Sequence, residues 1–297
     1  MDNIYSFRRL SLSTALALLL LAHFARAQPR NKCYNLSVDR QCIKKGQKYP
    51  NFGLVARAQP EIRELRSNFA GIVFALRADN TLVQLDSGAN ITRRFSGQNA
   101  TPFQHIQFRN RWQLFLFSPD NQTVTLLDRF LTPIDRYTFD LKLGWIGLAA
   151  PSADQSVWLF DETSLRLLRY DLRLGEIIGQ TALNLILAES AASPDQLEEY
   201  QNQLFLNVPD LGVLVFDALG NFREKLPFAA TGRFQFRDDK LCFWEAERQR
   251  FVCWHLYEKR LRYITSAYPE QRFTQALWLR RAHWYAKGNT IKVFEVP

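Results

Sequence analysis

The feature that most constrains the fold is a unit of two apolar runs around a short polar turn, which returns along most of the chain. Its copies are GIVFALRADNTLVQLD (71–86), WQLFLFSPDNQTVTLLD (112–128), SVWLFDETSLRLLRYD (156–171), NQLFLNVPDLGVLVFD (202–217), DKLCFWEAERQRFVCW (239–254) and AHWYAKGNTIKVFE (282–295). They close at Asp86, Asp128, Asp171, Asp217, Trp254 and Glu295, which are 42, 43, 46, 37 and 41 residues apart. A regular repeat of this length predicts an architecture built by repetition of one small β-unit.

Period-two alternation inside each unit, as in Trp158-Leu159-Phe160, predicts β-strands. A third strand follows at residues 89–95, 133–139, 175–181, 221–228 and 259–265. A further short run, expected to be the innermost strand of the next unit, lies at residues 103–108, 145–150, 233–237 and 275–280. Four strands about every 40 residues are typical of a propeller blade. The sequence therefore predicts an all-β chain with a single β-propeller of six four-stranded blades, in preference to a β-sandwich.

The sixth unit ends at Pro297 after its third strand, so the last blade lacks its outermost strand. Because a closed ring leaves no exposed strand edge, we expect the missing strand to come from the other end of the chain. Residues 52–58 (FGLVARA) are the candidate. The propeller is predicted to span residues 52–297.

The N-terminus has the three parts of a secretory signal. Arg8 and Arg9 close a basic region, residues 10–24 are apolar, and residues 25–27 (ARA) form an A-x-A cleavage site. A membrane anchor is the alternative, but the apolar stretch is shorter than the roughly 18–20 residues that cross a bilayer. We expect cleavage after Ala27, no transmembrane segment afterwards, and a soluble protein in the periplasm or outside the cell.

Four cysteines follow the predicted signal, and an even number in an exported chain suggests disulfides. If residues 240–245 and 250–255 form a hairpin, Cys242 lies opposite Cys253 at a distance that a disulfide can bridge. Cys33 and Cys42 would then close a loop in an N-terminal extension, residues 28–51. Zinc is the competing interpretation, but no C-x-x-C spacing is present.

The formal net charge is +9, and it falls to +7 without residues 1–27, which hold three arginines and one aspartate. The excess favours anionic partners. It is spread thinly, whereas nucleic-acid binding needs a concentrated basic stripe. A protein partner, a glycan or another component of the cell envelope fits better than a nucleic acid.

The segments VQLDSG (83–88) and VFDALGNF (215–222) carry the pattern L-x-x-x-D-x-x-G-x-I/F after a hairpin. In this pattern the chain resembles the NHL/TolB-like six-bladed propellers from about residue 52 onward. The resemblance implies architecture and leaves the activity open. Some propellers of this kind are calcium-dependent lactonases or esterases that hold the metal at the channel mouth. The carboxylates near predicted inner-strand starts are Glu61, Asp140, Asp195, Glu198 and Glu270.

Motifs of catalysis are missing: there is no G-x-S-x-G, H-E-x-x-H or G-x-G-x-x-G. Residues 181–196 form the longest loop, expected to be a short helix packed on one face or else a partner-binding lid. The candidate binding residues at the channel and its top face are His105, Trp145, Arg233, Arg272 and Trp278. The sequence favours an exported, non-enzymatic binding or scaffold propeller; the alternative is a calcium-dependent lactonase- or esterase-type hydrolase using the central channel.

Overall fold

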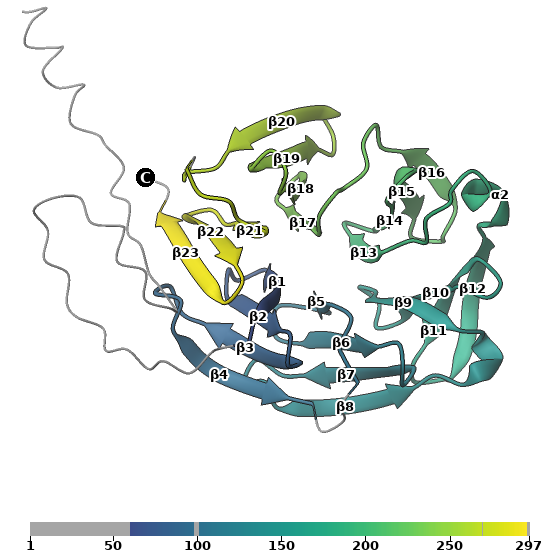
Figure 1. Ribbon diagram of the computed structural model, residues 1–297. Helices are drawn as coiled ribbons and strands as arrows, with labels where there is room; N and C mark the ends of the chain where they lie inside the picture. The colour runs from purple at the N-terminus through teal and green to yellow at the C-terminus, as the bar shows by residue number, and fades with distance from the viewer. Residues whose placement is uncertain (1–59, 98–100, 269, 296–297) are drawn as a thin grey trace, which may run out of the picture.

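The computed structural model describes residues 60–97, 101–268 and 270–295, and these form six antiparallel sheets arranged in a ring (Figure 1). Five sheets have four strands, and the sheet that contains β23 has three. We name the strands of each blade A to D from the axis outward. Strands that follow one another in the chain are neighbours in the sheet. The predicted all-β six-bladed propeller is confirmed.

The first three blades follow the chain in order. Blade 1 has β1 (Ile62–Ser67), β2 (Val73–Arg77), β3 (Thr81–Leu85) and β4 (Ile91–Ser96). Blade 2 has β5 (Ile106–Phe108), β6 (Leu114–Ser118), β7 (Thr123–Leu127) and β8 (Pro133–Thr138). The short 3-10 helix η1 (Leu141–Leu143) leads into blade 3, which has β9 (Ile146–Pro151), β10 (Val157–Asp161), β11 (Arg166–Asp171) and β12 (Glu176–Ala182).

The last three blades continue the ring. After the one-turn helix α2 (Asn184–Leu187), blade 4 has β13 (Gln196–Tyr200), β14 (Gln203–Val208), β15 (Gly212–Asp217) and β16 (Phe222–Lys225). Blade 5 has β17 (Phe234–Arg237), β18 (Lys240–Glu245), β19 (Arg250–His255) and β20 (Arg260–Thr265). Blade 6 has β21 (Gln275–Trp278), β22 (Ala282–Lys287) and β23 (Thr290–Glu295).

The B strands are apolar on both faces because each blade packs between two neighbours. Trp158 and Phe160 of β10 join the core shared with blade 4, while Leu159 between them joins the core shared with blade 2. All five residues of β10 are buried. The period-two alternation therefore separates two buried faces rather than a buried face from a solvated one.

Six hydrophobic clusters among the described residues lie one at each interface between neighbouring blades. The cluster between blades 6 and 1 includes Trp284 and Leu65, which are distant in sequence. The Ile62 N–H also donates to the Gly288 carbonyl at 2.8 Å. These contacts join blade 6 to blade 1. The predicted closure strand, residues 52–58, falls outside the described residues.

All four aspartates that close repeat units fix the C–D turns. In Asp86, Asp128 and Asp217 the Oδ1 atom accepts backbone N–H bonds of 2.8–2.9 Å from residues two and four positions later. Asp171 does the same for residues two and three positions later. An aspartate at the start of a turn thus accepts hydrogen bonds from backbone N–H groups of the turn that have no strand partner.

In several blades a side-chain amide in the B–C turn forms hydrogen bonds to the next blade. Asn80, Gln122 and Gln249 all have a positive φ, between 49° and 61°. The amide of Gln249 accepts from the Phe273 N–H at 2.7 Å and donates to the Phe273 carbonyl at 2.8 Å. Gln122 makes the same pair of bonds to Ile146. These amides act like a strand edge, pairing with the segment that enters the next blade.

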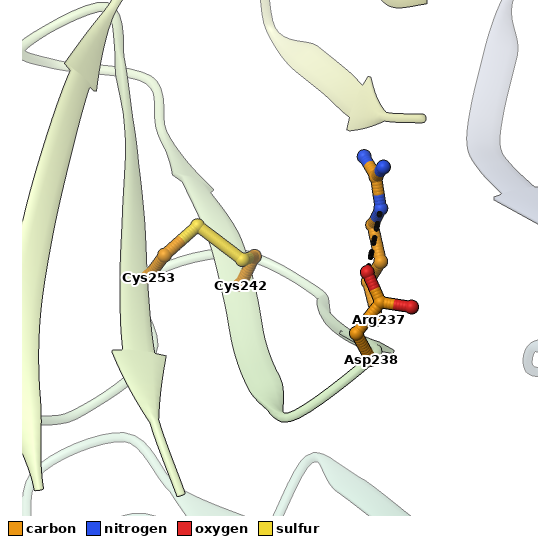
Figure 2. The surroundings of a disulfide bond; sticks show 4 residues. All are labelled: Arg237, Asp238, Cys242 and Cys253. Atoms are coloured by element: carbon orange, nitrogen blue, oxygen red, sulfur yellow. Dashed lines mark ion pairs between the residues drawn. A yellow bond between two sulfur atoms is a disulfide. The ribbon is translucent and has the colours of Figure 1, made fainter. Parts of the chain in front are cut away.

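The hairpin prediction in blade 5 is confirmed in its register. Cys242 lies opposite Cys253, with Glu245 opposite Arg250, and the two cysteines form a disulfide with a Cα–Cα distance of 4.2 Å (Figure 2). The predicted partners Cys33 and Cys42 fall outside the described residues.

The loop at residues 181–196 contains the expected short helix, α2. Its Leu187 is buried in the core between blades 3 and 4, while Leu185 is exposed. Within the described residues no helix is long and apolar enough to cross a membrane.

Candidate functional site

The A strands converge at the axis of the ring (Figure 1). Charged side chains from four blades meet there. We call them the axial charge cluster: Glu64, Arg66, His105, Glu198 and Arg233. Glu64 and Arg66 lie on β1 and Glu198 lies on β13. His105 directly precedes β5, and Arg233 directly precedes β17. Ring closure brings together residues that are up to 169 positions apart, as judged from Glu64 and Arg233.

Arg66 holds the centre of the cluster. Its Nη2 lies 2.5 Å from Glu198 Oε2, its Nη1 donates to the Phe234 carbonyl at 2.5 Å, and its Nε is 3.7 Å from Glu64 Oε1. Burial on its own would lower the pKa of Arg66, but the Glu198 and Glu64 carboxylates outweigh burial and raise it. Gln196 donates to the same Glu198 oxygen at 3.0 Å. The guanidinium therefore stays charged and fully engaged.

Glu64 and His105 form a second contact in the cluster. His105 Nδ1 lies 3.5 Å from Glu64 Oε2, which also accepts from the Ile106 N–H at 3.2 Å. Burial, aided by the Arg233 charge, lowers the pKa of His105, so the ring is neutral at pH 7 and donates from Nδ1. Burial opposes ionisation of Glu64, but the His105 hydrogen bond and the Arg66 and Arg233 charges prevail, and its pKa is lowered.

Arg233 completes the balance of charge at the axis. It donates to the Asp195 carbonyl at 2.5 Å, and burial lowers its pKa from the ordinary arginine value. An arginine side chain in a protein stays protonated at pH 7. With His105 neutral, the two guanidiniums of Arg66 and Arg233 offset the two carboxylates of Glu64 and Glu198. The cluster therefore carries no net charge at pH 7.

Glutamines on the A strands link neighbouring blades around this cluster. Gln107 of β5 donates to the Ala149 carbonyl at 2.9 Å. Gln196 of β13 exchanges two bonds with the backbone of Phe234, at 2.7 and 3.0 Å. Gln275 of β21 accepts from the Leu65 N–H at 3.0 Å. These amides satisfy A-strand backbone groups that have no strand partner on the axial side.

The structure brings together two of the five predicted binding residues. His105 and Arg233 both belong to the axial charge cluster. Trp278 packs against Phe251 and His283 at the interface of blades 5 and 6 rather than at the channel. Trp145 is exposed at the start of β9, and Arg272 donates to the Glu247 carbonyl at 3.1 Å near a B–C turn. Whether these residues bind a ligand stays a prediction.

The candidate calcium ligands do not converge on one another. Glu198 pairs with Arg66, Asp195 accepts from Asn207 Nδ2 at 2.8 Å, and Asp140 caps η1 by accepting from the Lys142 N–H at 2.9 Å. Within residues 60–97, 101–268 and 270–295 no group of three or more His, Cys, Asp or Glu side chains is placed to hold a metal ion.

A cleft of about 530 Å³ lies away from the axis, between the outer parts of blades 1 and 2. Phe95, Asn121 and Asp135 are among its lining residues, and the axial charge cluster contributes none. The charged centre and this cavity are therefore separate features of the molecule.

Aromatic and arginine side chains gather at turns that sequence reasoning did not single out. Consecutive strands of a blade run in opposite directions, so its A–B and C–D turns lie at the same end of the sheet. We call this side of the ring the A–B/C–D face. It carries Trp112 in the A–B turn of blade 2, 49 % exposed, and Phe130 in the C–D turn of blade 2, 50 % exposed.

Guanidinium groups alternate with these two rings. Arg129 lies over both, 5.4 Å from the Trp112 centroid and 4.7 Å from the Phe130 centroid. Arg111 lies 5.9 Å from the Trp112 ring, and Arg93 of β4 lies 5.1 Å from the Phe130 ring. We call these five residues the aromatic–arginine patch. The available sequence signal was an arginine directly before an aromatic residue in two turns of one blade.

No family model and no curated protein matches the sequence. Solved structures are similar in fold. The β-propeller domain of Myceliophteria thermophila Cps50 (Swd1) is 13% identical, covers 80% of this chain and 97% of its own, and superposes with a TM-score of 0.56. A catalytically inactive variant of virginiamycin B lyase from Staphylococcus aureus, crystallised with quinupristin, is 12% identical, covers 91% and 99%, and gives a TM-score of 0.53. At these identities the likeness shows the β-propeller fold alone.

Proposed function

We propose that the protein is an exported, non-enzymatic binding or scaffold propeller of the NHL/TolB-like kind, acting in the periplasm or outside the cell. The observation that carries the proposal is that the charged groups of the axial charge cluster are already paired with one another or with the backbone. Its arginines are bonded to carboxylates and backbone carbonyls, and its carboxylates face arginine, histidine or amide donors. A catalytic centre needs an acid, base or nucleophile that can reach a substrate.

Two members of the cluster are also buried, and His105, Glu198 and Arg233 are partly buried. Glu64 and Arg66 are 4 % and 5 % exposed. Breaking such a pair leaves an uncompensated buried charge, so the cluster favours a fixed arrangement over an opening one. We infer that it sets the angular alignment of blades 1, 2, 4 and 5, and that ligands meet the propeller elsewhere.

Export rests on the N-terminal sequence and is supported by the Cys242–Cys253 disulfide, a bond that persists in oxidising compartments. Its test is the N-terminus of the protein recovered from the host. Mass spectrometry that finds Gln28 as the first residue of the extracytoplasmic protein supports the proposal. A full-length chain in the cytoplasm contradicts it.

One observation favours the alternative, a metal-assisted hydrolase. His105 Nε2 is buried and, among the described residues, has no hydrogen-bond partner, while its Nδ1 is oriented by Glu64. A carboxylate-oriented histidine with an open nitrogen is one half of many hydrolytic sites. This nitrogen is what an entering water or substrate would meet.

The two functions separate in one experiment. The purified processed protein is assayed on a panel of lactones and esters with calcium or with EDTA, beside His105→Gln, and its thermal midpoint is measured under the same conditions. The binding-protein proposal expects no turnover above the His105→Gln level and no calcium-dependent rise of the midpoint. Calcium-dependent turnover that His105→Gln abolishes would establish the hydrolase instead.

A further inference from the structure

The aromatic–arginine patch makes part of the A–B/C–D face a surface for anions. In the part of the chain that the structure describes, no carboxylate forms an ion pair with Arg93, Arg111 or Arg129. Several arginines elsewhere on the blades, such as Arg169 with Asp154, are paired. Arg111 and Arg129 are exposed. Arg93 is half-buried and donates from Nη1 to Gln84 Oε1 at 3.3 Å. Exposed guanidiniums without a carboxylate partner can donate to phosphate or carboxylate oxygens of a ligand.

The turns that carry the patch are fixed before any ligand arrives. Asn110 Oδ1 accepts from the Trp112 N–H at 2.8 Å, and Asp128 Oδ1 accepts from the Phe130 N–H at 2.8 Å. In the A–B turn of blade 1, Asn68 Oδ1 accepts from the Ala70 and Ile72 N–H groups and leaves Phe69 62 % exposed. Rigid turns that hold aromatic rings outward lose little entropy on binding.

The ring faces are already occupied, which narrows the class of ligand. Guanidiniums cover the Trp112 and Phe130 faces, so a sugar ring would have to displace an arginine in order to stack there. Each ring residue is still about half exposed, Trp112 at 49 % and Phe130 at 50 %, with arginine beside it. Exposed aromatic rings beside arginine are suited to the boundary between the apolar chains and the charged headgroups of a membrane.

Exposed apolar and aromatic residues also lie in other turns of the same face. Leu174, Leu219 and Tyr257, all exposed, lie in the C–D turns of blades 3, 4 and 5. Arg280 and Arg281, both exposed, lie in the A–B turn of blade 6, next to blade 1. A linear polymer follows one path over such a face, whereas a flat surface can meet tips on several blades at once.

We propose that the A–B/C–D face docks on an anionic phospholipid bilayer, with the aromatic–arginine patch as its anchor. This deepens the proposed function and rests on it: the bilayer surface is the partner of the exported binding propeller. Arg93, Arg111 and Arg129 contact the headgroup phosphates, and Trp112, Phe130 and Phe69 enter the interfacial layer. Docking is strongest at low ionic strength because the attraction to the surface is screened by salt.

The test is co-sedimentation of the processed protein with phosphatidylcholine vesicles containing about one third phosphatidylglycerol, compared with pure phosphatidylcholine. We expect binding to the anionic vesicles only. Arg111→Gln/Arg129→Gln is expected to weaken it about 10- to 30-fold, and Trp112→Ala by about tenfold. Circular dichroism confirms that each variant is folded.

The matched controls lie at the opposite end of the blades. Trp145 is 42 % exposed at the start of the A strand β9, and Arg272 lies before the A strand β21. Trp145→Ala and Arg272→Gln are expected to bind the anionic vesicles as the unaltered protein does. Equal loss in the controls would overturn the assignment of the face.

Two further results would overturn the proposal. Equal binding to neutral vesicles would show that arginine is not involved. Binding to soluble polyglutamate or heparin without binding to vesicles would assign the patch to a soluble polyanion. A negative result in vesicle binding does not change the expected result of the lactone and ester assays. Failure of this inference can therefore be distinguished from failure of the proposed function.

Discussion

Acidification should destabilise the protein through His283, whose ring is enclosed by other aromatic rings. Its centroid is 5.4 Å from those of Phe251 and Trp278 and 6.3 Å from that of Phe294. Burial, reinforced by the Arg237 charge, lowers its pKa from 6.5 to about 4. The folded protein therefore keeps this ring neutral in a range where the unfolded chain protonates it.

The direction and the size of the change in stability follow from the difference between the folded and unfolded pKa values of His283. A histidine with a depressed folded pKa contributes its stability in full above 6.5, and the contribution is lost as the pH falls towards the folded value of about 4. About pH 5 lies about 1.5 units below the unfolded pKa, so the free energy of unfolding falls there by about 2 kcal/mol, at about 1.4 kcal/mol per unit. Solvent access at the ring edge reduces this loss, so we expect about 1–2 kcal/mol.

The assay is urea unfolding at about pH 7.5 and about pH 5, for the unaltered protein and for His283→Phe, which suits the aromatic enclosure and cannot titrate. Between the two pH values the unaltered protein should lose about 1–2 kcal/mol more than the variant does. His105 is present in both proteins, so its own acid sensitivity cancels in the comparison. An equal pH dependence in the two proteins would refute the reasoning.

Three further changes test the contacts that hold the ring. Arg66→Met should lower the free energy of unfolding by about 3–5 kcal/mol, since Glu64 and Glu198 lose the guanidinium that both of them contact; urea titration measures it. Gln249→Ala should cost about 1–3 kcal/mol in the same assay, because the buried Phe273 N–H loses its partner and the Phe273 carbonyl keeps only the Trp244 Nε1–H donor. Replacing Cys242 and Cys253 by serine should cost about 2–3 kcal/mol for a loop of this length, and reductant should lower the thermal midpoint of the unaltered protein but not of the variant.

The blade count and the inner strands could be predicted because they depend on local pattern. The runs at residues 103–108, 145–150, 233–237 and 275–280 became β5, β9, β17 and β21. The hairpin register in blade 5 followed from the length of its turn. The A strands of blades 1 and 4, β1 and β13, were given no bounds; in β13, QLEEY carries two glutamates in place of an apolar alternation. Those glutamates have partners only in the folded ring.

The candidate sites could be predicted less well, because they depend on how blades align around the axis. His105 was singled out for its place on an inner strand, but nothing local in the sequence shows that Glu64 or Arg233 will meet it. Trp145 and Trp278 were chosen as aromatic platforms with arginines nearby, whereas the aromatic and arginine side chains that gather on one face include Trp112 and Phe130. The orientation of a turn tip is set by its asparagine or aspartate, and the direction of each strand decides which face it joins.

The central claim is that ligands meet the A–B/C–D face and not the axis. The most direct test is one vesicle-binding titration that compares the unaltered protein, Arg111→Gln/Arg129→Gln and the axial variant His105→Gln under the same conditions. The account predicts that His105→Gln binds anionic vesicles as the unaltered protein does, while the double variant binds about 10- to 30-fold more weakly. Binding that His105→Gln abolishes and the double variant retains would contradict it.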